Sequence, residues 1–270
     1  MLEDATAVDK ARLRSCAHKK SGAWLNCIPK LALFKMNPAE FRICLRLRLG
    51  LEQLCIRTDV KCKCGVFPDA LGVHYLTCTT GNHLKTRHEV VSRAYHEMVQ
   101  ATGKLSEIRG LEDRLPGFTG PKGYRLVLDQ TIMDWESDHA DVGIDVAICH
   151  PCASTYVAAA STTDVSAATT RATQKVVKYD RACTAHDLEF RPAILEVFGA
   201  MHKDAEQLIK RAAQLLQNEL PEGTVKTWTA DSFAAFHQQR IAITLQRSNA
   251  KAIRYRSARD LRAAGFPGVD

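Results

Sequence analysis

The chain has 270 residues with a formal net charge of +7, and 46% of its residues are hydrophobic and 25% charged. This composition is typical of a folded domain and excludes an intrinsically disordered chain. No apolar run approaches the roughly 20 residues that cross a bilayer, and residues 1–20 lack the apolar core of a signal peptide. We therefore expect no membrane partner, a nuclear or otherwise intracellular location, and reduced cysteines in place of a disulfide framework.

The first half of the chain is predicted to be helical. Residues 5–18 have the pattern of a helix that is broken at Ser21 and Gly22. Asn37, followed by proline, signals the start of a second helix that ends at Gly50. Its spacing places four apolar residues on a buried face: Phe41, Cys44, Leu45 and Leu49. A third helix is expected over residues 84–101.

Between these helices lies a candidate metal-binding segment, residues 60–80, which we call the knuckle. Three cysteines and one histidine follow the order C-x-C-x9-H-x3-C: Cys62, Cys64, His74 and Cys78. This is a donor set typical of a closed tetrahedral zinc site, although the first gap is shorter than usual. Gly65 suits a chain that folds back around an ion. His83 or His88 could replace His74, and the alternative is a turn with reduced cysteines and a surface histidine.

From residue 104 the pattern changes to strands alternating with helices. We predict strands over 105–111, 124–128, 142–148 and 190–198, and helices over 172–183, 202–218 and 231–264. This order predicts an α/β core. The expected organisation is a helical connector region (1–58), the zinc knuckle with its following helix (59–103), and a core domain with C-terminal helices (104–270).

Acidic residues in this second half are candidates for a catalytic metal site. Asp145 interrupts the apolar run 143–148, where a carboxylate is costly unless it is satisfied. Asp129 follows the preceding predicted strand, with Asp134 and Asp141 as competitors. A third acid would be Glu112 or Glu107. Carboxylates that converge on Mg²⁺ are the requirement for metal-dependent phosphodiester cleavage, and restriction-type nucleases place them on neighbouring strands. The alternative for Asp145 is a carboxylate at a strand end that faces solvent.

Nucleases of this type also need a lysine, usually close behind the second acid. Here the position two residues after Asp145 is Ala147. Lys175 and Lys178 lie on the next predicted helix, three residues apart and therefore on one face. Either could reach the acids; the alternative is a solvated helix face.

Two basic stretches, over residues 42–63 and 240–262, suit contacts with phosphate groups. The alternative is that they are solvated helix faces. We select four residues as candidate nucleic-acid contacts: Arg87, Arg247, Lys251 and Arg254.

Taken in order, these motifs resemble a known arrangement. The Cys62–Cys78 motif followed by residues 81–88 resembles the zinc knuckle that follows the reverse transcriptase domain of site-specific non-LTR retrotransposons. A restriction-like endonuclease domain comes next in that family, and the series Arg125, Asp129, Asp145, Lys175 and Lys178 resembles its catalytic run. Residues 24–51 resemble the connector after the polymerase thumb.

The resemblance implies a PD-(D/E)xK endonuclease with structural Zn²⁺ and catalytic Mg²⁺ held by Asp129 and Asp145. It also implies DNA and RNA partners and nicking of target DNA to prime reverse transcription. The chain would be the C-terminal part of a reverse-transcriptase polypeptide or a separate relative. Val127 stands where the family has its first catalytic aspartate. Either the acid has moved two residues to Asp129 on the same strand face, or the site is degenerate and the chain only binds nucleic acid.

Overall fold

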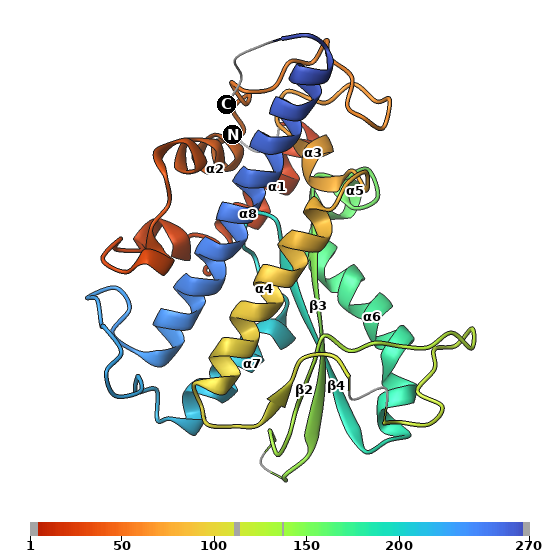
Figure 1. Cartoon of the computed structure of the whole chain (residues 1–270), viewed down its shortest axis with the longest axis vertical. Helices are drawn as coiled ribbons and strands as arrows, with labels where there is room; N and C mark the ends of the chain where they lie inside the picture. Colours follow the sequence, from red (N-terminus) through yellow and green to blue (C-terminus); the bar gives the residue numbers. More distant parts are fainter. Residues whose placement is uncertain (1–4, 111–113, 137, 267–270) are drawn as a thin grey trace.

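The computed structural model describes residues 5–110, 114–136 and 138–266, and within them the fold is mixed α/β with a four-stranded sheet (Figure 1). The strands follow in the order β1 (Ser106–Glu107), β2 (Gln130–Ile132), β3 (Asp141–Cys149) and β4 (Leu188–Glu196). The first two pairings are antiparallel and the third, between β3 and β4, is parallel. The sheet is therefore mixed, and the chain returns from β3 to β4 through a helical crossover.

Eight α-helices surround the sheet within the described ranges. They are α1 (Ala7–Ala17), α2 (Pro38–Leu49), α3 (Val73–Thr77), α4 (His83–Gln100), α5 (Val157–Ala160), α6 (Ser166–Thr184), α7 (Lys203–Leu215) and α8 (Phe233–Ala263). Helix α6 packs on one side of β3 and β4, while α4 and α7 cover the other side (Figure 1). The long helix α8 lies alongside α4 and also contacts α2 and α3.

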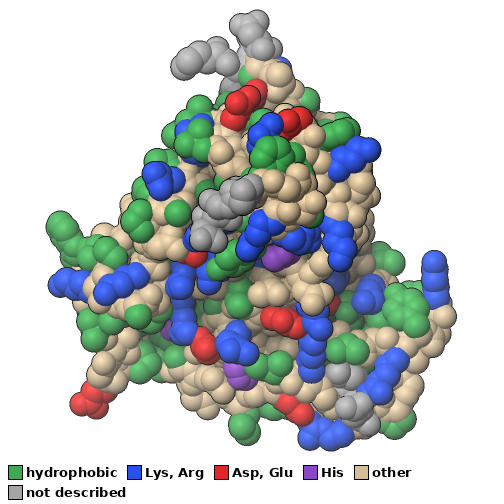
Figure 2. Space-filling view, turned by 45° about the horizontal axis from the view of Figure 1, so that its top comes forward, with side chains coloured by type: hydrophobic (Ala, Val, Ile, Leu, Met, Phe, Trp, Pro, Cys, Tyr) green, Lys and Arg blue, Asp and Glu red, His purple; other side chains and the backbone are tan. Residues whose placement is uncertain are grey.

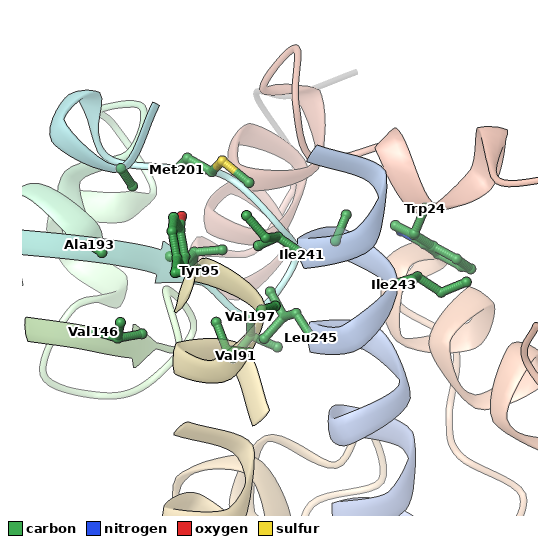
Figure 3. Close-up of a cluster of buried hydrophobic side chains, with 14 of the residues drawn as sticks. Trp24, Val91, Tyr95, Val146, Ala193, Val197, Met201, Ile241, Ile243 and Leu245 are labelled. Atoms are coloured by element: carbon green, nitrogen blue, oxygen red, sulfur yellow. The ribbon is translucent and has the colours of Figure 1, made fainter. Parts of the chain in front are cut away.

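The main core is built where α4 and α8 meet the sheet. Val91 and Tyr95 of α4 pack between Val146 of β3 and the Ile241–Leu245 turn of α8 (Figure 3). The same buried cluster extends to Trp24 in a 3-10 turn, Ala23–Asn26. Residues from all three predicted regions thus share one core. The division into regions at residues 58 and 103 remains a prediction.

Helix α2 begins and ends at the predicted residues, but it does not bury the predicted face. The Asn37 side chain accepts a hydrogen bond from the Glu40 amide at 2.8 Å, and Gly50 ends the helix with φ of 71°. The predicted face was wrong for two of its residues, because Phe41 and Leu49 are 41% and 55% exposed. The helix instead buries a different face: Ile43, Cys44 and Leu47. Apolar residues occur on both sides, and contact with α8 decides which side is covered.

The predicted strand over 124–128 was also wrong. The chain there is extended, but its pairing is a single isolated bridge from Arg125 to Thr119, and β2 begins only at Gln130. Leu126 and Leu128 are buried against Tyr179 and its neighbours on α6. The β-rich run that predicted a strand instead packs its leucines against a helix.

Candidate metal centre and acid pair

Cys62, Cys64, His74 and Cys78, the cysteine cluster, lie together on the knuckle. Their donor atoms all fall within 4.8 Å of one another, and Cys64 Sγ is 3.5 Å from His74 Nε2. Across the described parts of the chain, no other group of three or more histidine, cysteine or acidic side chains converges in this way. Three sulfurs and one imidazole nitrogen are a donor set that suits tetrahedral zinc. The residues present therefore fit a metal such as zinc.

The local sequence explains how the short first gap is accommodated. Gly65 adopts φ of 89°, and its amide donates to the Cys62 carbonyl at 2.7 Å. The Cys62 amide in turn donates to the Val66 carbonyl at 2.9 Å, which closes a tight turn with both sulfurs on it. Asp69 accepts hydrogen bonds from the Val73 and His74 amides at 3.0 and 2.6 Å. This carboxylate fixes the start of α3, which carries His74 and leads directly into Cys78.

Helix α8 supports the cysteine cluster through two arginines that sequence reasoning had counted only as surface charge. Arg256 is fully buried and donates to the Cys78 and Tyr75 carbonyls at 2.8 and 3.2 Å. Nη2 of Arg256 and Nη2 of Arg259 lie 3.6 and 3.7 Å from Cys62 Sγ. Both guanidinium groups thus lie against one of the sulfurs of the cysteine cluster. Their position next to the knuckle had no separate signal in the sequence.

The Cys78 thiol has an altered acidity in this setting. Burial raises its pKa, but hydrogen bonds with Thr80 and Arg256 outweigh burial and lower the pKa to about 7. A thiol of this kind is partly ionised near neutral pH.

The two histidines considered as alternatives to His74 lie elsewhere. His83 begins α4 and does not belong to the converging group. His88, one turn further along α4, points to a different site: its Nε2 lies 2.8 Å from Oδ2 of Asp129. This contact was missed by sequence reasoning, because the two residues are 41 positions apart and no local pattern connects them.

Asp129 and Asp145, the acid pair, both lie at the middle of β3, because Asp129 binds the backbone amide of Val146, the residue that follows Asp145. Asp129 is 6% exposed, and its Oδ2 also accepts a hydrogen bond from the Val146 amide at 2.8 Å. Arg109 Nη2 is 3.7 Å from its other oxygen. The hydrogen bond with Asp129 is the main reason that the pKa of His88 is raised. Asp129 immediately precedes β2 and is not part of a strand. The expected displacement of the acid from position 127 to position 129 along one strand face therefore does not describe where Asp129 lies.

Asp145 lies within β3 and is 4% exposed. Its partner is Lys175 of α6, whose Nζ is 2.5 Å from Oδ2. Lys178, one turn further, donates to the Tyr179 hydroxyl at 3.0 Å, and that hydroxyl donates to the Val127 carbonyl at 2.8 Å. Burial, and then the charge of Lys175, lowers the pKa of Lys178. The structure thus brings both predicted lysines to the acid pair's side of α6.

The other acids considered from the sequence have different places. Glu112 lies outside the described residues. Glu107 of β1 pairs with Arg114. Asp134 pairs with Lys104 and His139, and its amide donates to Asp141 at 2.7 Å. The described residues therefore add no third carboxylate to the acid pair, and both of its carboxylates already have cationic partners. Magnesium has no support from this geometry.

The four candidate nucleic-acid contacts differ in exposure. Arg87 is buried and donates to Asn249 Oδ1 at 3.1 Å and the Leu76 carbonyl at 3.0 Å, and burial lowers its pKa to about 10. It links α4 to α8 and the knuckle and does not lie on the open surface. Lys251 is exposed, while Arg247 and Arg254 are half-buried. Lys and Arg side chains prevail over acidic ones on the face shown in Figure 2.

Comparisons of the chain with protein-family models, with curated proteins and with solved structures found no match. Among the described helices, none combines the length and the apolar character needed to cross a membrane. The interpretation of function therefore depends on the cysteine cluster, the acid pair and the surfaces around them.

Proposed function

We propose that this chain is a metal-dependent DNA endonuclease with a PD-(D/E)xK core and a zinc-knuckle module that binds nucleic acid. The observation that carries this proposal is the buried contact of Asp145 with Lys175, beside a second buried carboxylate, Asp129. Buried charges are costly and are often retained at functional sites. The contact joins a central strand to the helix that follows it. This supports the expectation that Lys175 supplies the lysine that is missing at Ala147.

Each residue has a proposed role in phosphodiester hydrolysis. Asp129 and Asp145 would hold Mg²⁺, which supplies a nucleophilic water and neutralises charge on the phosphate when it is bound. Lys175 provides a positive charge where negative charge develops on the phosphate, and Lys178 reinforces it. His88 holds the Asp129 carboxylate against β3. Glu112 would be an accessory acid.

The knuckle and α8 are the proposed nucleic-acid-binding surface. Arg247, Lys251 and Arg254 follow each other at intervals of four and three residues on α8, which keeps them on one side of the helix. Phosphate contacts from such residues supply affinity without sequence preference. By its resemblance to retrotransposon endonucleases, the chain would nick target DNA for reverse transcription and would contact both DNA and RNA.

Nicking of supercoiled plasmid DNA with Mg²⁺ tests the enzymatic proposal. We expect the wild-type protein to produce open circles and Asp145→Asn to reduce the rate to background. Lys175→Met should lower the rate by about 10²–10³-fold, the usual effect of removing one electrostatic contact to the transition state. Asp180→Asn is the matched control, since Asp180 is an exposed carboxylate on the same helix as Lys175. Nicking that persists in Asp145→Asn would reject the assignment.

A second candidate function is a zinc-containing nucleic-acid-binding protein without nuclease activity. One observation favours it: both carboxylates already have partners, Asp129 in His88 and Arg109, and Asp145 in Lys175. A metal would have to displace these contacts. No nicking by the wild-type protein, together with retained DNA binding, would favour this function over the first.

A further inference from the structure

A cavity of about 350 Å³ lies between the two candidate sites. One end is lined by Leu76 and Thr77 of α3, next to Cys78 of the cysteine cluster, and the other by Lys175, the partner of Asp145. The remaining walls come from α4, the second half of β3, the segment after it, and α6. Its volume is at the lower end of the range of about 300–1,000 Å³ that small-molecule sites occupy.

The charged lining of this cavity is entirely basic among the described residues. Arg171 and Lys175 lie four residues apart on α6, so both project from the same side of the helix. Arg87 and His88 contribute from α4, and no aspartate or glutamate lines the cavity. A concave surface with one sign of charge concentrates counter-ions of the opposite sign. The cavity therefore favours an anionic group.

His150 adds an uncharged ring to the same wall. Its Nδ1 accepts a hydrogen bond from the Cys152 amide at 3.2 Å, so the ring hydrogen is on Nε2. Burial lowers the pKa of His150 to about 3, which keeps the ring neutral. Nε2 of His150 and Nε of Arg87 are buried without a hydrogen-bond partner among the described residues. Both atoms lie below the accessible surface, so they shape this wall without being open to a ligand in the cavity.

The rest of the lining is apolar and contains one aromatic ring. Tyr156 is half-buried at the cavity, and Leu84, Ile148 and Ala153 complete an apolar wall with it. A phosphate group by itself would leave this surface without a partner. An anionic group joined to a flat ring would use both parts, since aromatic side chains stack on nucleobases of any sequence.

We propose that this cavity binds one nucleotide unit of a single-stranded nucleic acid, with its phosphate on Arg171 and its base against Tyr156. The inference rests on the proposed function for the class of polymer and extends it to a specific contact. A duplex cannot present an isolated base to a cavity without unpairing it. The chain thus prefers unpaired or gapped strands next to the acid pair.

Fluorescence anisotropy with a short labelled DNA strand tests this proposal, with the zinc-containing protein and without added magnesium so that cleavage does not contribute. We expect Arg171→Gln and Tyr156→Ala each to weaken binding of the single strand about tenfold, the order of effect of one base-stacking contact. Binding of a blunt duplex should change much less. Arg171→Lys should retain part of the affinity, because it keeps the charge. Tyr156→Phe should retain most of it, because it keeps the ring.

The control is Arg181→Gln, which removes an exposed arginine from the last turn of the same helix. Thermal melting of each variant establishes that it is folded. Wild-type affinity in both Arg171→Gln and Tyr156→Ala would overturn the inference. Competition by inorganic phosphate, combined with no effect of Tyr156→Ala, would also overturn it, because the cavity would then be an anion site only. If the wild-type protein fails to nick DNA but both variants lose single-strand affinity, the nuclease proposal fails and this inference stands.

Discussion

The cysteine cluster and the acid pair differ in how their donor groups are satisfied. In the cluster, four donor atoms from one short segment converge within 4.8 Å. In the acid pair, each carboxylate has a side chain from another element as its partner, His88 of α4 or Lys175 of α6. The cluster is therefore arranged for a metal as it stands, whereas the acid pair must exchange partners to bind one. We therefore expect folding of the knuckle to depend on a bound metal, and the acid pair to be stable without one.

Loss of metal from the cysteine cluster is expected to have the largest effect. Cys78→Ser, or a strong chelator, should reduce the bound zinc from one equivalent to well below half. It should also lower the free energy of unfolding by several kcal/mol, because structural zinc binding is coupled to folding. Metal analysis and denaturant unfolding measure both changes.

Cys27→Ser is the matched control, because Cys27 is half-buried and contacts Ala23 and Gln239 away from the cluster. It should leave the zinc content unchanged. Full stability of the Cys78→Ser protein would show that the knuckle folds without metal and would remove the contrast with the acid pair.

Removal of one partner of the buried ion pair should have the next largest effect. Lys175→Met leaves Asp145 buried without its cation and should cost about 3–5 kcal/mol, the usual result for such pairs. The double variant Asp145→Asn/Lys175→Met should recover much of this loss, because neither charge remains. A double-mutant cycle from urea unfolding at neutral pH measures the coupling. Additive effects of the two substitutions would show that the acid pair does not depend on this contact for stability.

The free energy of unfolding also depends on pH through His237, which belongs to neither the cysteine cluster nor the acid pair. Burial lowers the pKa of His237 from 6.5 to about 4. The unfolded chain therefore binds a proton between pH 6.5 and 4 that the folded chain does not, so stability falls as the pH is lowered through this window. The loss is on the order of 3 kcal/mol at the acid end.

His237→Gln should make stability less dependent on pH between 6.5 and 4 when unfolding is followed in denaturant. His139→Gln is the control, since His139 is an exposed histidine. An unchanged slope in His237→Gln would assign the acid sensitivity to other groups.

The smallest expected effect concerns nucleic-acid binding by α8. Lys251→Gln removes one exposed charge and should reduce the slope of log K against log salt by about 1 for duplex DNA. Lys35→Gln is the control, because Lys35 is also exposed but lies in the N-terminal region. Equal slopes for wild type and Lys251→Gln would exclude this side of α8 from the phosphate contacts.

Local sequence signals predicted those parts of the fold that depend on neighbouring residues. The cap at Asn37 and the left-handed Gly50 placed α2 correctly, and the apolar run around Asp145 placed β3. The acid pair was less predictable. The strand predicted before Asp129 was wrong because a run of β-favouring residues does not show whether its apolar side chains pack within a sheet or against a helix. The buried face of α2 failed because two apolar sides were available and α8 selected one.

By itself, the sequence determined the three cysteines of the knuckle and the turn at Gly65, because these residues fall within one short segment. The structure selected His74 over His83 and His88 as the fourth donor. The sequence also favoured a buried Asp145 over a solvent-facing one, and the structure confirms this burial. Only the tertiary structure decided the partners of these groups: His88 with Asp129, Lys175 with Asp145, and Arg256 with the knuckle. The physical reason is the distance along the chain over which the interactions act. Turns and caps are set by interactions over a few residues, whereas the partner of a buried charge depends on how distant helices pack around one core.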